Sequence, residues 1–258
     1  LLTPLDHTAP GKKRSEEWWQ IYEAPYKEQY HSTRFVTERT QQFIKESCEG
    51  DEPWMALCSY PDPHHPMCPP GPWFDRHSPD DMLLPQSRHD PLEHAPAHLR
   101  LFQGVHPAKQ RDWVAPCGFG NDRLLSQAIA ATYGMIEMVD EGVGQILRQL
   151  EELGVRDNTI IVFTSDHGDM MGDHGLFLKG FMHYRGTLQV PLIIDAPGMP
   201  ALRSCGLSSS IDIAPTLLEL CSLAGYDGIQ GKSLTPMLAD AAARAVSYTH
   251  LTLPTNGC

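Results

Sequence analysis

The chain has 258 residues, 41% of them hydrophobic and 20% charged, which is enough to build a substantial core in one large domain or in one domain with an appendage. It carries 20 Lys and Arg against 32 Asp and Glu, so its formal net charge is −12. This acidic balance disfavours non-specific binding to nucleic acid or to an anionic membrane, and we expect no nucleic-acid partner. No apolar run reaches the length of a membrane span. The seven cysteines form no CxxC pair, so we expect mostly free or buried thiols and no disulfide framework.

The first third of the chain predicts a helix and a strand behind a surface segment. Residues 1–30 are polar and aromatic and contain several prolines, so we expect them to lie on the surface. Apolar residues of "STRFVTERTQQFIKES" (32–47) recur with the spacing of one helical face. The short apolar run "PWMALCSY" (53–60) stands between turn residues and predicts a buried strand.

Residues 61–121 predict a long irregular region. Most of the prolines and many of the histidines fall here, and the histidines are too unevenly spaced for a finger-type zinc site. Loops of this length inside a compact domain are usually functional or disordered.

Regular elements return after this region. Apolar residues at three- and four-residue steps predict a long amphipathic helix over 123–154, ended by Gly154. "IIVFTSD" (160–166) is apolar on both faces, as expected of a central strand in a parallel sheet, and 190–198 predicts a further strand. A helix beginning near Ile213 and a short helix in "GIQGKSLTPML" follow. This order predicts an α/β fold with a doubly wound, mostly parallel sheet between helices.

Both ends of the chain look incomplete. The first residue is Leu1 rather than Met, with no signal peptide, so neither compartment nor targeting is predicted. Residues 245–258, "AVSYTHLTLPTNGC", do not continue the pattern of the preceding sequence, and we expect them to be a non-native tail. The sequence thus predicts one partial α/β domain over 31–240. It predicts no oligomeric state.

Chemistry is concentrated in "IIVFTSDHGDMMGDHGLFLKG" (160–180). Asp166 and His167 follow the predicted strand, at the edge where open α/β sheets bind ligands, and Gly168 would allow the backbone to turn there. A carboxylate and an imidazole can then reach one cation, although two ligands do not complete its shell. The alternative is a polar exit from the strand, with the aspartate capping a turn.

Three more residues of this segment have two readings each. Lys179, with apolar neighbours, could present its ammonium group to a sulfate or phosphate oxygen. Alternatively, it is a surface lysine whose stem covers apolar area. Asp173 and His174 could be further metal ligands, but we favour a role in fixing the loop by hydrogen bonds.

"SYPDPHHPMCPP" (59–70) places His64 and His65 just after the first predicted strand. The surrounding prolines restrict the backbone, so the imidazoles are presented at low entropic cost. A histidine held in this way suits an acid that protonates a leaving oxygen. The alternative is a histidine stacked in a proline-rich surface loop.

These segments, together with "YGMIEMVDEGVGQILRQLEELG" and "SSSIDIAPTLLELCSLAGYDGIQGKSLTPML", resemble the sulfatases of the alkaline-phosphatase superfamily over roughly residues 30–240. The resemblance implies an alkaline-phosphatase-like fold and a divalent cation, most often Ca²⁺. It implies that Asp166 and His167 are two metal ligands and that Lys179 contacts the sulfate. His64 matches the histidine near the ester oxygen, with His65 as the alternate.

The chain departs from the family pattern at several places. The sulfatase nucleophile is a formylglycine made from the Cys or Ser of a C/S-x-P-x-R motif, and no such motif occurs in this chain. We therefore expect the formylglycine and an aspartate pair that completes the metal site upstream of the chain. Gln189 stands where many relatives carry Arg, and the usual C-terminal subdomain is missing.

The resemblance thus implies a sulfuric ester hydrolase that acts on a small-molecule or saccharide sulfate ester in full length, with this fragment inactive by itself. One alternative is a phosphonate monoester or phosphodiester hydrolase of the same superfamily, with Mn²⁺ or Zn²⁺. Another is a non-catalytic binding domain that retains the fold.

Overall fold

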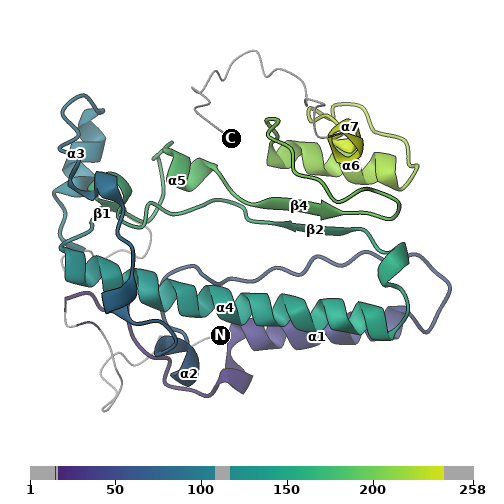
Figure 1. Ribbon diagram of the computed structural model, residues 1–258, viewed down its shortest axis with the longest axis horizontal. Coiled ribbons are helices and arrows are strands. Elements are labelled where there is room, and N and C mark those ends of the chain that lie inside the picture. Colours follow the sequence, from purple (N-terminus) through teal and green to yellow (C-terminus); the bar gives the residue numbers. More distant parts are fainter. Residues whose placement is uncertain (1–14, 16, 108–116, 241–258) are drawn as a thin grey trace. The chain divides into compact units, whose positions relative to one another are not determined.

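The structure is a computed structural model that describes residue 15, residues 17–107 and residues 117–240 (Figure 1). The chain divides into two compact units: Leu1–Arg156 with His167–Gln189, and Asp157–Asp166 with Val190–Cys258. The predicted tail, 245–258, lies outside the described residues. The predicted domain range 31–240 is shared between the two units, and it stays a prediction.

The first unit contains helices and one short pair of strands. In chain order these are α1 (Ser32–Ser47), α2 (Gly71–Phe74), α3 (Ala97–Gln103), β1 (Cys117–Gly118), α4 (Asp122–Glu152), β3 (Leu176–Phe177) and α5 (Arg185–Leu188). The second unit contains β2 (Ile161–Thr164), β4 (Leu192–Asp195), α6 (Ile213–Leu220) and α7 (Thr235–Ala239).

The two long helices of the first unit confirm the predictions over 32–47 and 123–154. The side chain of Asn121 caps α4 by accepting the N–H of Leu124 at 2.9 Å. After the helix, Gly154 adopts a φ of 69°, which ends the helix in the left-handed region. Helices α1 and α4 run side by side (Figure 1), and Arg34 of α1 donates to Gln145 of α4 at 3.1 Å.

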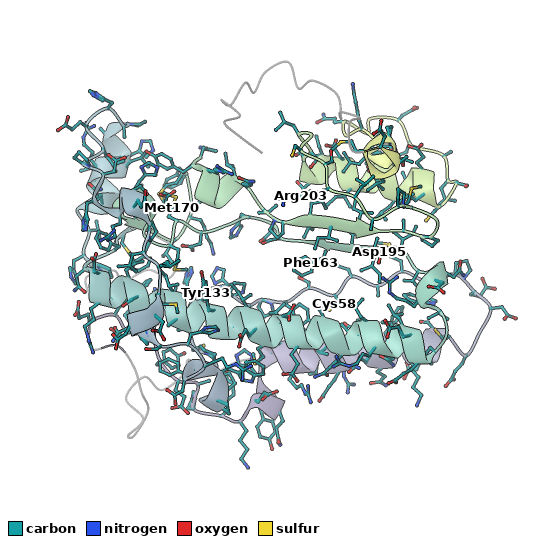
Figure 2. The ribbon with its side chains drawn as sticks, in the orientation of Figure 1. Cys58, Tyr133, Phe163, Met170, Asp195 and Arg203 are labelled. Atoms are coloured by element: carbon teal, nitrogen blue, oxygen red, sulfur yellow. The ribbon has the colours of Figure 1, made fainter. Side chains whose placement is uncertain are left out.

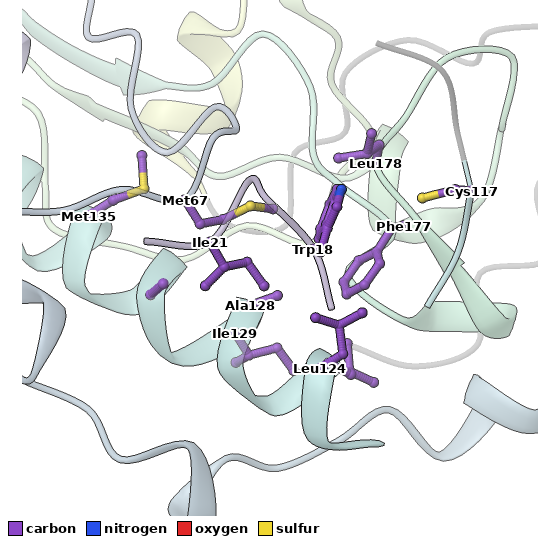
Figure 3. Packing of buried hydrophobic residues seen from close by; sticks show 12 residues of the cluster. Trp18, Ile21, Met67, Cys117, Leu124, Ala128, Ile129, Met135, Phe177 and Leu178 are labelled. Atoms are coloured by element: carbon purple, nitrogen blue, oxygen red, sulfur yellow. The ribbon is translucent and has the colours of Figure 1, made fainter. Parts of the chain in front are cut away.

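The core of the first unit joins the N-terminal segment to α4 and β3 (Figure 3). Trp18 is fully buried and stacks on Phe177, with 5.0 Å between ring centroids. Ile21 and Leu124 belong to the same cluster. The described part of the predicted surface segment 1–30 therefore departs from the prediction, because its large apolar side chains cover the start of α4.

The second unit contains a two-stranded sheet in which β2 and β4 are antiparallel, with Ile161 opposite Asp195 and Thr164 opposite Leu192. Figure 2 labels Phe163 on β2 and Asp195 on β4. Both predicted strands are confirmed, but β2 does not have the parallel neighbour that we expected, and Phe163 and Ile193 are exposed. Strands β1 and β3 of the first unit also pair antiparallel. The prediction for β2 failed because an apolar run specifies only an extended segment, whereas residues distant in the sequence determine which strand pairs with it.

The prediction of a buried strand over 53–60 is wrong. These residues form no described strand, and Met55 and Leu57 are 78% and 86% exposed. An apolar run becomes a buried strand only where a neighbouring strand accepts and donates its backbone hydrogen bonds, and none of the described strands pairs with this run. Among the described helices, none combines the length and the apolar character needed to cross a membrane.

Candidate metal and anion site

Asp166 and His167 lie just after the carboxyl end of β2, as the sequence predicted. Asp166 is exposed, and its carboxylate accepts a long hydrogen bond of 3.4 Å from the hydroxyl of Ser165. The ring of His167 donates from Nδ1 to the carbonyl of Gly168 at 2.9 Å. This hydrogen bond fixes the tautomer of the neutral imidazole and places its lone pair on Nε2. Asp166 ends one segment of the second unit and His167 begins one of the first, so their joint coordination of a metal stays a proposal.

Gly168 is needed for close packing rather than for an unusual turn, which corrects our prediction. Its φ is not among the positive values of the chain. Its N–H donates to the carbonyl of Thr187 at 2.9 Å, and a Cβ at this position would lie 1.9 Å from the carbonyl oxygen of Gly186. The segment that follows His167 is therefore in direct backbone contact with the start of α5.

Asp169 is a site residue that the sequence analysis missed. Its Oδ1 accepts the N–H groups of Met171 at 2.9 Å and Leu178 at 3.1 Å, which closes the loop between them. Burial raises the pKa of this carboxyl, while the hydrogen bonds from the Met171 and Leu178 N–H groups and the positive charge of Lys179 lower it. Asp169 follows His167 by two positions, and its bond to Leu178 holds the residue before Lys179, so one carboxylate connects the segments that carry both residues. The only sequence signal was a further acidic residue directly after "DHG", which is also typical of a local turn.

Lys179 follows three fully buried residues, Leu176, Phe177 and Leu178, which belong to the hydrophobic clusters of the first unit. Figure 3 shows Phe177 and Leu178 beside Trp18. The lysine itself is partly buried. Its backbone is held by the core, and its charge lies close to Asp169. The role of Lys179 in binding an anion stays a prediction.

Asp173 and His174 fix the loop, as we favoured. His174 Nδ1 lies 2.6 Å from Asp90 Oδ2, and its ring stacks on Tyr184 with 4.2 Å between centroids. Asp173 accepts a short hydrogen bond from the hydroxyl of Ser87. These contacts tie the turn before β3 to residues 87–90 of the long irregular region. Their atoms are engaged in structure, so the assignment as extra metal ligands loses support.

His64 and His65 differ in exposure, and this bears on the choice between them. His64 is exposed, whereas His65 is buried. The Nδ1 of His64 donates to the carbonyl of His65 at 2.6 Å, and the two rings stack at 4.0 Å. Only His64 therefore presents its ring to solvent, which supports it as the candidate acid.

A complete metal shell is absent from the described part of the chain, where no group of three or more His, Cys, Asp and Glu side chains is placed to hold an ion. A calcium ion needs about six to eight oxygen ligands and zinc about four donors. Asp166 and His167 offer a carboxylate and an imidazole, which suit a divalent cation, but they supply only part of its shell. A cation bound there would need further ligands from other residues.

One cavity lies away from these residues, within the first unit. It has a volume of about 350 Å³ and is lined by residues 88–91, the end of α3, β1 and Gly175. None of His64, Lys179, Asp166 or His167 lines it.

The chain is similar in sequence to proteins of known families. A family model described as Sulfatase matches residues 5–223. An arylsulfatase of Clostridium perfringens is 32% identical over 232 residues, covering 87% of this chain and 45% of the relative. A multifunctional alkaline phosphatase superfamily protein of Trinickia caryophylli, PehA, is 29% identical over 226 residues, covering 82% of this chain and 42% of the relative.

Solved structures agree with the fold class. The phosphonate monoester hydrolase SpPMH of Silicibacter pomeroyi superposes with a TM-score of 0.74 at 28% identity, covering 88% of this chain and 44% of its own. The phosphonate monoester hydrolase of Agrobacterium radiobacter superposes with a TM-score of 0.71 at 29% identity, covering 84% of this chain and 44% of its own. These similarities confirm the predicted α/β, alkaline-phosphatase-like fold. The chain spans less than half the length of these relatives.

Proposed function

Because the chain belongs to the sulfatase family of the alkaline-phosphatase superfamily, we propose that it is part of a longer sulfuric ester hydrolase that cleaves sulfate monoesters. The observation that carries this proposal is the loop closed by Asp169, whose Oδ1 accepts the N–H of Leu178 at 3.1 Å, because this bond ties the residue before Lys179 to the segment that begins at His167. The chain has no C/S-x-P-x-R motif, so the formylglycine nucleophile would be contributed by residues outside it. The chain alone would then be inactive.

Each candidate residue would have a separate task. Lys179 would hold a non-bridging oxygen of the sulfate and stabilise the negative charge that develops there, a contribution of ~2–4 kcal/mol for a single donor. His64 would carry a proton on Nε2 and donate it to the departing alcohol oxygen. Its Nδ1, which already donates to the His65 carbonyl, would keep the ring in one orientation.

A divalent metal, most often Ca²⁺ in such a site, would be bound in part by Asp166 and His167. When bound, such a cation withdraws charge from an oxygen ligand and so favours attack on the ester. The loop that follows His167, closed by Asp169 and packed against Gly186, would hold the backbone on the carboxyl side of this imidazole.

A phosphonate monoester or phosphodiester hydrolase is the second candidate. It is favoured by the similarity to the two phosphonate monoester hydrolase structures, which match 84% and 88% of this chain. Such an enzyme would use Mn²⁺ or Zn²⁺. The relative rates of the full-length protein on 4-nitrophenyl sulfate and on phenylphosphonate esters decide between the two, because a preference for the phospho-ester by orders of magnitude would reject the sulfatase assignment.

The central test is the change Asp166→Ala in the full-length protein. We expect it to abolish hydrolysis and to lower the bound metal, measured by elemental analysis, because a charged ligand is lost. Asp227→Ala is the matched control, since Asp227 is an exposed carboxylate of the same unit, and it should leave both values unchanged. Wild-type rate and metal content in Asp166→Ala would remove Asp166 from the site.

A non-catalytic binding domain is the remaining alternative. It predicts that the wild-type full-length protein binds sulfate esters without hydrolysing either ester class. Turnover that depends on Lys179 would exclude this reading.

A further inference from the structure

A buried acid–imidazole pair lies beside the loop that carries His64. His31 is 2% exposed, and its Nδ1 lies 3.4 Å from Oδ2 of Asp62, whose side chain is 8% exposed. Thr33 donates a short hydrogen bond from its hydroxyl to the same carboxylate oxygen. Burying a carboxyl group is costly unless it is hydrogen-bonded, and here the hydroxyl of Thr33 supplies that bond.

The pair connects two elements that are distant in sequence. His31 is the N-cap of α1, and its Nδ1 accepts the N–H of Thr33 at 3.3 Å, so the hydrogen bond to the neighbouring Asp62 carboxyl comes from the Thr33 hydroxyl and not from this nitrogen. Asp62 belongs to the proline-rich segment that begins the long irregular region. One turn further along α1, Thr37 lies 3.0 Å from the hydroxyl of Tyr60. The first turn and a half of α1 thus holds the entrance of the His64 loop through side-chain contacts.

The exit of the same loop is held by backbone hydrogen bonds. Met67 donates to the carbonyl of Gln20 at 2.7 Å, and Tyr22 donates to the carbonyl of Met67 at 3.2 Å. Met67 is also part of the core cluster around Trp18. His64 therefore lies in a short loop that is anchored at both ends, at Asp62 and at Met67.

His64 itself has little freedom within this loop. Its N–H donates to the carbonyl of Pro61 at 3.0 Å, its Nδ1 donates to the carbonyl of His65, and its ring lies on the buried ring of His65. In the described part of the chain its Nε2 makes no hydrogen bond, so this nitrogen is available to a substrate. Rotation of the segment around Asp62 would move all of these contacts together.

We propose that His31, Thr33 and Asp62 are positioning residues for the acid: the buried pair sets the direction in which His64 presents Nε2 to the leaving oxygen. The proposal rests on the proposed role of His64 as the proton donor. None of the three residues is expected to touch the substrate. They therefore affect the reaction only by orienting the imidazole of His64. A displacement of about 1 Å at such a group can lower the rate ~10²-fold.

The test uses the dependence of kcat on the leaving group in the full-length protein. Proton donation matters most for a poor leaving group, and general acid catalysis is worth ~10²–10⁴-fold. We expect Asp62→Ala to lower kcat ~10²-fold or more for an alkyl ester and less than ~10-fold for the 4-nitrophenyl ester, with KM unchanged for both. Asp62→Asn, which still accepts the hydroxyl of Thr33, should restore most of the loss. Equal losses on the two esters would overturn the proposal.

Two further variants separate the possible failures. His64→Ala must show the same leaving-group dependence; if it does not, the proposed role of His64 fails, and the positioning role falls with it for that distinct reason. If His64→Ala shows the dependence and Asp62→Ala does not, the positioning role alone is wrong. Asp80→Ala, at an exposed carboxylate of the same irregular region, is the control and should leave both rates unchanged.

A milder variant covers the case in which Asp62→Ala does not fold. Thr33→Val keeps the shape of the side chain but removes the donor to Asp62. We expect it to lower kcat for the alkyl ester ~10-fold, roughly one hydrogen bond to a charged group, and to leave the 4-nitrophenyl rate within about twofold. An unchanged ratio between the two esters, with a folded protein by circular dichroism, would contradict the proposal.

Discussion

At the scale of single residues, the site depends on carboxylates that hold loops in place. Asp169 joins the backbone at Met171 and Leu178, Asp90 holds His174, and Asp62 holds the entrance of the His64 loop. Each spans a different gap in sequence, yet all three act on segments that carry candidate site residues or adjoin them. The proposed reaction thus depends on carboxylates that hold the site loops in place but take no part in the chemical steps.

Asp90 gives a prediction about pH. Its carboxylate accepts the N–H of Leu92 at 2.9 Å and pairs with His174, and these contacts hold the pKa of Asp90 below its usual range. A lowered pKa in the folded state adds stability above the unfolded pKa of about 3.9 and loses it as the pH falls through the folded value. We expect the free energy of unfolding to fall below about pH 4, and Asp90→Asn to weaken that dependence while destabilising the protein at neutral pH.

Denaturant unfolding at a series of pH values measures this effect. Asp80→Asn serves as the control because Asp80 is exposed and lies in the same irregular region. It should retain the pH dependence of the wild type. If Asp90→Asn and Asp80→Asn behaved alike, the pair with His174 would have no energetic role.

At the scale of elements, the segment that contains Gly168 packs its backbone directly against the backbone of α5 at Gly186. A Cβ on Gly168 would lie 1.9 Å from the carbonyl oxygen of Gly186, so Gly168→Ala must displace one of the two segments. We expect a loss of about 1–3 kcal/mol in stability, the usual range for overpacking. Thermal unfolding of the chain measures it.

Gly144→Ala is the matched control for this change. Gly144 lies inside α4, and a Cβ there would meet only the end of the Arg148 side chain at 3.4 Å. Alanine favours a helix over glycine by roughly 0.5–1 kcal/mol, so this variant should be more stable than the wild type. A stable Gly168→Ala protein would show that the contact with Gly186 is not needed.

Elements were predictable where their pattern is local. The periodic apolar residues of 32–47 and 123–154 specify a helix because the hydrogen bonds of a helix lie within the segment itself. The runs 53–60 and 160–166 have similar apolar character but different outcomes: one forms no described strand and the other pairs antiparallel with β4. The partner of a strand is non-local, so the run alone could not specify it.

At the scale of the whole molecule, the two units differ in how they are stabilised. Both hydrophobic clusters of the described residues lie in the first unit, whereas the second contains a two-stranded sheet with exposed apolar residues. A sheet of two strands is only marginally stable in water. Hydrogen exchange should therefore be at least ~10²-fold slower for the buried amides of α4 than for those of β2 and β4.

Mass spectrometry of peptic peptides resolves these regions within one sample, so α4 is an internal standard for β2 and β4. Equal protection of the two would mean that the second unit opens only with the first.

The sequence by itself determined the family, the α/β class, the two long helices and the candidate residues at the end of the "IIVFTS" run. Motifs and helical periodicity depend only on residues that are close together in the sequence. Only the tertiary structure showed that Trp18 and Ile21 enter the core, that His64 rather than His65 is exposed, and that Asp62 lies against the first turn of α1. These depend on contacts between residues far apart in the chain. Burial and local charge are properties of the folded surroundings, and no single segment contains them.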